Sequence, residues 1–272
     1  MDFALDHLTV TDTTPSQLVR VAARAGYRAV CLFMQPMEVL PRMPAFDIYG
    51  PTEERRLTKA LLDDLGIGLD LAYPFTLSGR TVVETFAPAL ETAAYLGAKA
   101  VNVLAYDREP QRRQEVFAAF CDLALAYGLD VAVEFFPTSQ VRTLDAALDL
   151  TAAYGAPGKV GVNLDLLHLV RSGAALADIC AVPAEALLYA QFCDGGVAGE
   201  REGWDFEASS QRLYPGEGTF DLAGFAAALP KAIRASIEIP REDLLVAGVP
   251  VDERAARALA ATRRAIQPPT VG

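Results

Sequence analysis

The feature that most constrains the fold is a regular alternation of short apolar runs with longer helix-like segments that end at glycine. Three of these ends, Leu65-Gly66, Leu96-Gly97 and Tyr127-Gly128, recur at intervals of 31 residues, about the size of one strand–helix unit. The apolar runs are nearly continuous, as expected for parallel strands with both faces covered. The pattern predicts strands over Phe3–Val10, Ala29–Phe33, Gly68–Ala72, Ala100–Leu104, Val131–Phe135, Val160–Leu164, Leu187–Phe192 and Ala235–Ile239.

Eight strand–helix units in a chain of 272 residues favour a single closed (β/α)8 TIM barrel. A doubly wound open sheet is the competing α/β fold, but no GxGxxG or P-loop sequence follows the first strand. We expect residues 1–266 to form the barrel and Gln267–Gly272 to be a disordered C-terminal tail. Helices are expected over Pro15–Ala25, Thr52–Leu65, Val82–Leu96, Arg112–Tyr127, Leu144–Tyr154, Ala174–Ile179, Asp221–Leu229 and Asp252–Ile266.

The charge balance and the missing targeting signals exclude several classes of protein. A net charge of −11 argues against binding to nucleic acid and to anionic membrane surfaces. No apolar stretch approaches the ~18 residues of a membrane span, and the N-terminus lacks the basic residues of a signal peptide. The four cysteines form no CxxC pair and are expected to be reduced and mostly buried. We therefore expect a cytoplasmic protein with a small-molecule partner; homodimers and homotetramers are common for such barrels.

Polar side chains lie at the ends of the last four predicted strands, where the catalytic groups of such barrels are found. They are Glu134, Asn163, Asp165, Gln191, Asp194 and Glu238. Burying three carboxylates together is unfavourable unless a cation neutralises them. Three carboxylates and an amide oxygen suit Mg²⁺ or Mn²⁺ better than a structural Zn²⁺. The alternative is that each acid caps a helix or pairs with an arginine.

Such a metal site would support proton transfer next to a carbonyl group. A metal that chelates a carbonyl oxygen and the adjacent hydroxyl oxygen stabilises the enediolate formed when the α C–H proton leaves. Glu134 and Glu238 are expected on different sides of the metal, so that one removes the proton and the other returns it. Return to the same carbon is epimerisation, and return to the neighbouring carbon is aldose–ketose isomerisation. Loss of a β-substituent would instead make the protein a dehydratase or lyase, and the sequence leaves these outcomes open.

The same segments resemble the xylose isomerase-like barrel superfamily of sugar isomerases and epimerases, which also contains endonuclease IV. The matching segments are Val133-Glu134, Asn163–His168, Gln191–Asp194, Ser236–Glu238 and, as an R-x-x-P-G-x-G turn, Arg212–Gly218. The resemblance implies that the metal ligands are Glu134, Asp165, Gln191 and Glu238. Many members have His where Gln191 stands. The glutamine is more similar to hydroxypyruvate-isomerase-like and some dehydratase branches, which favours Mn²⁺ or Mg²⁺, with Co²⁺ and Zn²⁺ as further options.

Other residues are candidates for contacting the substrate. The resemblance implies that His168 binds a substrate oxygen or Asp165, and that Arg212 holds hydroxyl or carboxylate groups. His168 is also a candidate catalytic residue. From their positions near strand ends, His7, Tyr73 and Asn102 could contact substrate, although His7 could equally be a core histidine. Trp204 lies in the long segment 195–210, which is expected to be a lid over the pocket, with a surface or oligomer contact as the alternative.

Together these features predict a divalent-metal-dependent isomerase or epimerase in carbohydrate metabolism. The substrate is expected to be an unphosphorylated keto-sugar or related hydroxy-carbonyl compound, because the later strand ends carry no cluster of Lys and Arg. The alternative is a dehydratase or lyase acting on a keto-sugar, keto-glycoside or keto-cyclitol. A non-catalytic barrel is disfavoured because no expected ligand position is lost. A nuclease of the endonuclease IV type is disfavoured because two histidines cannot supply its His-rich multi-metal site.

Overall fold

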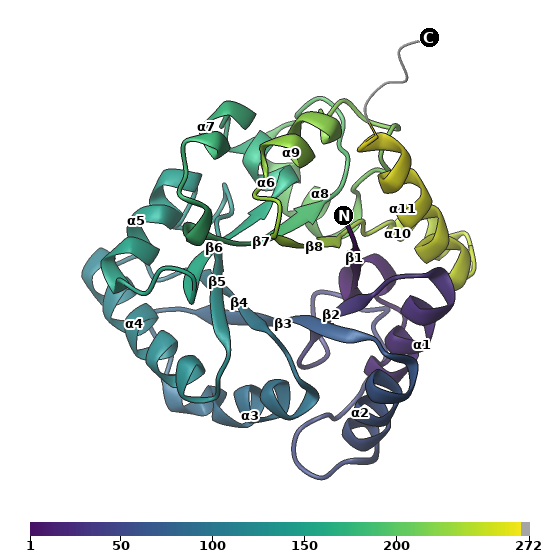
Figure 1. The fold of residues 1–272 in the computed structure, drawn as a ribbon, viewed down its shortest axis with the longest axis horizontal. Coiled ribbons are helices and arrows are strands. Elements are labelled where there is room, and N and C mark those ends of the chain that lie inside the picture. Colours follow the sequence, from purple (N-terminus) through teal and green to yellow (C-terminus); the bar gives the residue numbers. More distant parts are fainter. Residues whose placement is uncertain (268–272) are drawn as a thin grey trace.

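The computed structural model describes residues 1–267, which form a closed barrel of parallel β-strands (Figure 1). The strands are β1 (Phe3–Asp6), β2 (Ala29–Phe33), β3 (Gly68–Leu77), β4 (Ala100–Ala105), β5 (Asp130–Glu134), β6 (Val160–Asp165), β7 (Leu187–Phe192) and β8 (Arg234–Ile237). Each strand pairs in parallel with the next, and β1 closes the ring against β8. This arrangement confirms the single-domain (β/α)8 barrel predicted from the repeating pattern.

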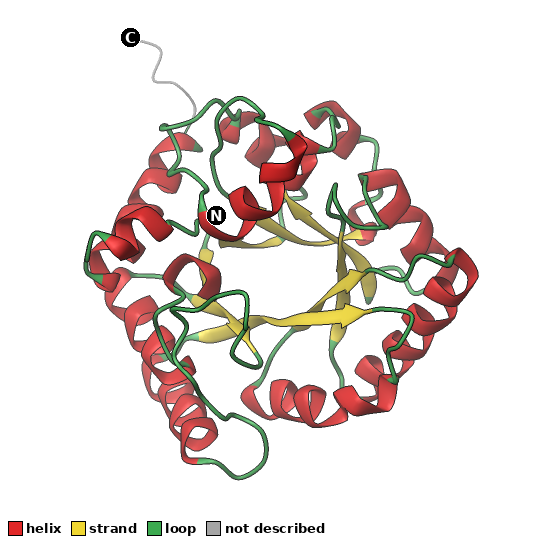
Figure 2. Cartoon of the chain, turned by 180° about the vertical axis from the view of Figure 1, so that it is seen from behind, coloured by secondary structure: helices red, strands yellow, loops and turns green. Residues whose placement is uncertain are grey.

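Most of the helices surround the ring of strands on the outside, and short ones lie across one end of the barrel (Figure 2). They are α1 (Pro15–Ala25), α2 (Glu53–Leu65), α3 (Ala87–Leu96), α4 (Pro110–Ala126), α5 (Leu144–Tyr154), α6 (Leu166–Arg171), α7 (Leu176–Cys180), α8 (Trp204–Ser210), α9 (Leu222–Ala228), α10 (Glu242–Val246) and α11 (Val251–Ala265). In α1, Leu18, Val19 and Ala22 are buried, and the helix ends at Gly26 with φ 85°. Only glycine adopts this left-handed conformation without strain, which is why the glycines mark the helix ends.

Some element ends differ from the predicted ones because local capping and pairing decide them. Strand β1 ends at Asp6, whose carboxylate accepts a hydrogen bond from Leu8 N and so begins a 3-10 helix at His7–Val10. Strand β3 continues to Leu77 because it goes on pairing with β4. The helix expected from Val82 begins with a 3-10 turn and becomes α-helical only at Ala87. Hydrophobic periodicity does not resolve such details.

The hydrophobic pattern also misses three short helices. Helix α6 follows directly after β6, and the Asp165 carboxylate caps it by accepting a hydrogen bond from His168 N. Helix α8 lies inside the segment predicted to be a lid, and α10 follows β8. Each has seven residues or fewer, so its helical period is weak in the sequence.

The side chains that point into the barrel form two layers. Small and aromatic residues fill its lower part, among them Ala4, Ala29, Ala100, Ala132 and Tyr189. Because side chains two residues apart on a strand point to the same face, the next inward positions are those at 6, 102, 134 and 191. These positions carry Asp6, Asn102, Glu134 and Gln191, and all four are buried. Strand periodicity therefore places a polar layer above an apolar floor.

The remaining expectations concern cysteines, membranes and the tail. Cys31, Cys121 and Cys193 are buried and Cys180 is exposed, and all four are free thiols, in agreement with the prediction. Within residues 1–267, no helix combines the length and the apolar character needed to cross a bilayer. The tail expected to be disordered, 267–272, lies outside the described residues except for Gln267.

Candidate active site

A cavity of about 430 Å³ lies at the carboxyl ends of the strands, where barrel enzymes place their active sites. Its polar lining residues include Asn102, Glu134, His168, Arg212 and Glu238. Leu8, Phe33, Met37, Leu40, Tyr73, Leu104, Tyr106 and Phe136 give it a large apolar and aromatic surface, and α8 contributes Asp205, Ala208 and Ser209. The cavity thus combines a few converging polar groups with apolar walls, as small-molecule sites do.

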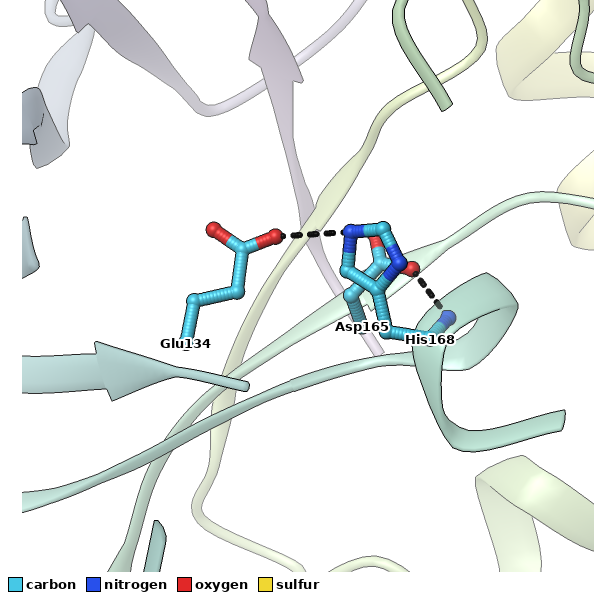
Figure 3. A group of neighbouring side chains, drawn as sticks. All are labelled: Glu134, Asp165 and His168. Carbon is cyan, nitrogen blue, oxygen red and sulfur yellow. Dashed lines mark hydrogen bonds and ion pairs between the residues drawn. The ribbon is translucent and has the colours of Figure 1, made fainter. Parts of the chain in front are cut away.

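Glu134, Asp165 and His168 form the cluster best suited to hold a metal ion (Figure 3). Glu134 ends β5 and Asp165 ends β6, so neighbouring strands present both carboxylates at the same edge. Capping of α6 by Asp165, with His168 N 3.0 Å from Oδ1, orients the histidine, whose Nε2 lies 3.1 Å from Glu134 Oε1. One ligand atom from each residue lies within 4.8 Å of the others.

Arg212 is a buried cation between two of the predicted ligands. Its Nη1 lies 2.5 Å from Asp165 Oδ2, and its Nη2 lies 2.8 Å from Glu238 Oε2. Burial opposes ionisation of Asp165 and is the largest single influence, but the charge of Arg212 and the other favourable contacts of the carboxylate together outweigh it and lower the pKa of Asp165 to about 2. Burial raises the pKa of Glu238 well above its ordinary range, and Arg212 offsets this only in part. The sequence left open that an acid of the site pairs with an arginine. Asp165 and Glu238 do so in the structure.

Sequence reasoning missed Asp6, a fully buried carboxylate on β1. Its Oδ1 accepts hydrogen bonds from the Tyr73 hydroxyl and from Leu8 N. Burial raises the pKa of Asp6 to about 7, although these hydrogen bonds and the charge of Arg212 oppose the rise. The sequence did contain a signal for Asp6. It lies two residues after Ala4 on β1, and side chains two residues apart on a strand point to the same face. Tyr73 lines the cavity, as expected of a candidate substrate contact.

The side chain of Gln191 forms no hydrogen bond with the other predicted ligands, although Gln191 and Asp165 are paired residues of neighbouring strands. Its Nε2 donates to Asp6 Oδ2 at 3.3 Å, and its Oε1 accepts from Asn163 Nδ2. Asn163 Nδ2 also donates to Asn102 Oδ1 at 3.2 Å, and Asn102 Nδ2 donates to Glu134 Oε2. The four predicted ligands thus lie in one connected site, but Gln191 reaches Glu134 only through two asparagines.

Two predicted substrate contacts, His7 and Trp204, do not line the cavity in this structure. His7 is fully buried, and both ring nitrogens face the backbone: Nε2 lies 2.9 Å from Thr13 O, and Nδ1 accepts from Phe33 N at 3.3 Å. His7 is therefore a core histidine, which was the alternative considered from the sequence. Burial lowers the pKa of His7 to about 4. Trp204 is absent from the cavity walls, and its Nε1 donates to Gly199 O. Because α8 turns Trp204 away, Asp205 and its neighbours cover the cavity instead.

Asp194 closes the turn that carries Arg212. Its carboxylate accepts backbone hydrogen bonds from Gly195, Gly216, Gly218 and Phe220. A Cβ atom at Gly218 would collide with the Asp194 carboxylate, so glycine is needed there for the close approach. Asp194 therefore acts on the loop and does not line the cavity.

The charges of the residues in the site suit a divalent cation. Four buried carboxylates, Asp6, Glu134, Asp165 and Glu238, surround one buried guanidinium, that of Arg212. Arg212 pairs with two of them, which leaves an excess of negative charge where solvent cannot screen it. That excess contributes to the raised pKa of Glu238. Carboxylate oxygens together with an imidazole nitrogen are donors that Mn²⁺, Mg²⁺, Co²⁺ and Zn²⁺ accept to different degrees.

The chain belongs to the xylose isomerase-like TIM barrel family, whose model matches residues 19–265. No curated protein sequence matches the chain significantly. Among solved structures, a xylose isomerase-like TIM barrel/4-hydroxyphenylpyruvate dioxygenase fusion protein superposes with a TM-score of 0.77 at 21% identity over 96% of this chain. The chain spans 42% of the length of that fusion protein.

Other solved structures superpose on this chain over nearly their whole length. The IOLI protein with a bound zinc atom gives a TM-score of 0.79 at 17% identity, covering 98% of both chains. D-allulose 3-epimerase from Methylomonas sp. gives 0.70 at 16% identity, covering 97% of both. The probable 3-DHS dehydratase AsbF from Bacillus anthracis gives 0.74 at 16% identity, covering 97% of this chain and 99% of that one. At these identities the likeness establishes the fold.

Proposed function

We propose that this protein is a divalent-metal-dependent isomerase or epimerase of an unphosphorylated keto-sugar or a related hydroxy-carbonyl compound. One observation carries the proposal: two buried carboxylates, Glu134 and Glu238, line the same cavity from strands three positions apart around the barrel. A substrate between them would have a proton-transferring group on each of two sides. This is the arrangement that inversion at a carbon next to a carbonyl group requires.

The residues of the chain suggest how the proton moves. One carboxylate takes the proton from the carbon next to the carbonyl, and the electron pair of that C–H bond moves toward the carbonyl oxygen. The other carboxylate, when protonated, returns a proton to the opposite face of the same carbon. Glu238 suits the role of proton donor because burial raises its pKa. Glu134 is held in place by a hydrogen bond from Asn102 and by its contact with His168.

Glu134, Asp165 and His168 would hold the metal ion, with Glu238 as a further ligand if Arg212 moves toward substrate. When bound, the ion would supply Lewis-acid stabilisation of the negative charge that develops on the substrate oxygens. His168 would also keep Glu134 oriented, because the two side chains are in contact. We propose Mn²⁺ or Mg²⁺ as the native ion because carboxylates dominate the donor set.

The cavity favours a neutral substrate. Among residues 1–267, Arg212 is the one Lys or Arg that lines it, and both of its arms pair with carboxylates. A phosphate group would therefore find no free cation and would face Asp205, Glu134 and Glu238. A polyhydroxylated carbonyl compound would meet acceptors at the strand ends and apolar walls elsewhere.

Elimination by the same proton abstraction is the second candidate, because a probable dehydratase shares this fold. Incubation of the Mn²⁺-loaded protein with keto-sugars in D₂O separates the two. Deuterium in a stereoisomer of otherwise unchanged composition supports epimerisation, whereas an enone chromophore supports elimination. A panel of neutral keto-sugars that gives neither product contradicts the proposed function.

Substitution of the two carboxylates tests the proton-transfer assignment. We expect Glu134→Gln and Glu238→Gln each to lower kcat by at least about a hundredfold, because an amide cannot exchange the proton. Circular dichroism should show an intact fold. Glu253→Gln on the exposed face of α11 is the matched control and should keep full activity. Turnover near the wild-type rate in both site variants would remove these residues from the reaction.

Metal removal tests the cofactor assignment separately. EDTA should abolish turnover, and Mn²⁺ should restore it better than Zn²⁺ does, because oxygen donors outnumber nitrogen donors. Restoration by Zn²⁺ in preference to Mn²⁺ would instead indicate that the imidazole of His168 dominates the site. Activity that survives complete removal of metal would contradict the metal-dependent assignment.

A further inference from the structure

A second cavity of about 280 Å³, the side cavity, adjoins the active-site cavity described above, the main cavity. Leu8, Val39, Leu40 and Ser209 line both. We infer that the side cavity is a subsite for a neutral aryl unit of the substrate, which is then a conjugate of a hydroxy-carbonyl compound with an aromatic group. The inference rests on the proposed function in one respect, that the hydroxy-carbonyl unit occupies the main cavity.

The side cavity is built at the same end of the barrel as the main cavity. Thr11 follows the 3-10 helix after β1, Pro41 lies in the loop between β2 and α2, and Pro240 follows β8. Leu245 belongs to α10, which also comes after β8. Segments that follow the strands of such a barrel gather at its carboxyl face, where substrates bind. The side cavity is therefore in a position to extend the active site.

Helix α8 forms part of the wall between the two cavities and presents a different side to each. Asp205, Ala208 and Ser209 line the main cavity, whereas Phe206, Ser209 and Ser210 line the side cavity. Residues three or four positions apart lie on the same side of a helix, so the two sets are neighbouring sides that meet at Ser209. A ligand that extends past Ser209 would contact both cavities.

The charges around the side cavity favour a neutral occupant. Three arginines contribute to its lining, and each of them pairs with an acid. A neutral unit leaves these pairs intact, whereas an anionic group would compete with the acids for the arginines. The pairs are Arg42–Glu242 at 3.8 Å, Arg241–Glu217 at 2.7 Å and Arg254–Asp12 at 2.6 Å.

The apolar part of the lining favours an aromatic ring. Phe206 is 51% exposed and Val39 is 76% exposed, and Pro41, Pro240 and Leu245 continue the apolar wall. Exposed apolar side chains that gather at one place mark a site where a ligand or partner binds. An aryl ring would cover this surface and pack against the ring of Phe206, since aromatic rings attract one another in offset and edge-to-face arrangements.

Two neutral keto-sugars that differ in one substituent test the inference, 6-O-benzyl-D-fructose and 6-O-methyl-D-fructose. The readout is the dissociation constant of each, measured by saturation-transfer difference NMR in the presence of diamagnetic Mg²⁺. Leu245→Trp fills the side cavity from α10, and Phe206→Ser removes an apolar wall that is already half exposed, so this variant should fold. Val246→Trp is the matched control, because Val246 is 59% exposed on the same helix and lies outside the lining of both cavities.

We expect the wild type to bind the benzyl compound roughly tenfold more tightly than the methyl compound, because burial of an aryl ring is favourable. The aryl protons should receive the strongest saturation. The preference for the benzyl compound should largely disappear in Leu245→Trp and in Phe206→Ser. Val246→Trp should keep the wild-type preference.

Three results would overturn the inference. Equal binding of both compounds by the wild type, or binding of neither, would show that the side cavity takes no aryl unit. A benzyl preference that survives in both Leu245→Trp and Phe206→Ser would place the ring against the aromatic walls of the main cavity. A wild-type dimer in sedimentation velocity that becomes a monomer in Phe206→Ser would show that a second copy of the chain covers the side cavity.

The binding measurement needs no turnover. A failure of the proposed function would therefore appear separately, as a wild type that prefers the benzyl compound but incorporates no deuterium into it in D₂O and forms no enone.

Discussion

At the scale of single residues, Arg212 has the largest influence on the electrostatics of the site. The turn that carries it resembles a family sequence motif, which suggested a residue facing substrate. The structure instead shows a guanidinium that is 2% exposed and shared between Asp165 and Glu238. It therefore acts first as an internal counter-ion for the two acids. The ion pairs and the proposed metal share these carboxylates, so Arg212 has to shift if Glu238 is to bind the ion.

Removal of Arg212 should destabilise the metal-free protein strongly. In Arg212→Met, two buried carboxylates lose their counter-ion, and we expect the free energy of unfolding to fall by about 3–5 kcal/mol. Urea denaturation followed by circular dichroism measures this change. Arg24→Met is the matched control: the pair of Arg24 with Asp252 is more than half exposed on both sides, so its loss should cost less than about 1 kcal/mol. Equal losses in both variants would contradict the role of Arg212 as a buried counter-ion.

The two histidines show the limit of sequence reasoning at this scale. Both follow an aspartate near a strand end, His7 directly and His168 after three residues. His168 follows the helix cap of α6 and therefore lines the cavity. His7 begins a 3-10 helix, and its ring is directed to backbone groups. The difference depends on which turn follows the strand, and turns of this length leave no periodic signal in the sequence.

At the scale of elements, α8 is the part of the predicted lid that covers the cavity. It contributes Asp205, Ala208 and Ser209 to the walls. Asp205 accepts a hydrogen bond from Thr138 at 2.6 Å, which ties the helix to the loop after β5. The opposite side is held by Arg171 of α6, whose guanidinium contacts Glu207 at 2.5 and 2.8 Å. Arg212 Nε also donates to Ala208 O at 3.0 Å, so the covering helix is held to the barrel at three points.

We expect Arg171→Met to loosen this segment. Arg171 is buried and also donates to Gly196 O at 3.0 Å, so its loss removes both the ion pair and a backbone contact. Limited proteolysis with trypsin should cleave after exposed Arg201 roughly tenfold faster than in the wild type, because local opening becomes less costly. Arg24→Met should leave the cleavage rate unchanged. No acceleration in Arg171→Met would indicate that other contacts hold α8 in place.

At the scale of the whole molecule, periodicity was enough to predict the barrel. Strands that are apolar on both faces require a covered parallel sheet, and repeated glycine helix ends give the unit size. Polar side chains at the ends of the last four strands, together with the family resemblance, led to Glu134, Asp165, Gln191 and Glu238 as one set of candidates. What periodicity could not provide is the pairing among them. Which carboxylate meets Arg212, and which amide meets which neighbour, depends on distances between strands far apart in sequence.

The buried acids also make the stability of the whole protein depend on pH. Burial raises the pKa of Asp6 to about 7 and that of Glu238 well above its ordinary value, so both bind protons more tightly in the folded chain than in the unfolded one. Their contribution is fully present below about pH 4 and is lost as the pH rises toward 7 and beyond. Asp165, with its pKa lowered to about 2, contributes above about pH 4 and loses its contribution as the pH falls toward 2.

The metal-free protein should therefore have a lower Tm at pH 8 than at pH 5. Mn²⁺ should raise Tm at pH 8 more than at pH 5, because the ion binds deprotonated carboxylates and offsets the charge that destabilises them. Differential scanning calorimetry at both pH values, with and without Mn²⁺, measures the two effects. In Glu238→Gln the metal-free decline should be shallower, since one of the two acids with a raised pKa is gone, whereas Glu253→Gln should keep the wild-type slope. An equal shift of Tm by Mn²⁺ at both pH values would show that the ion binds away from these acids, and the excess of buried negative charge would then need another counter-ion.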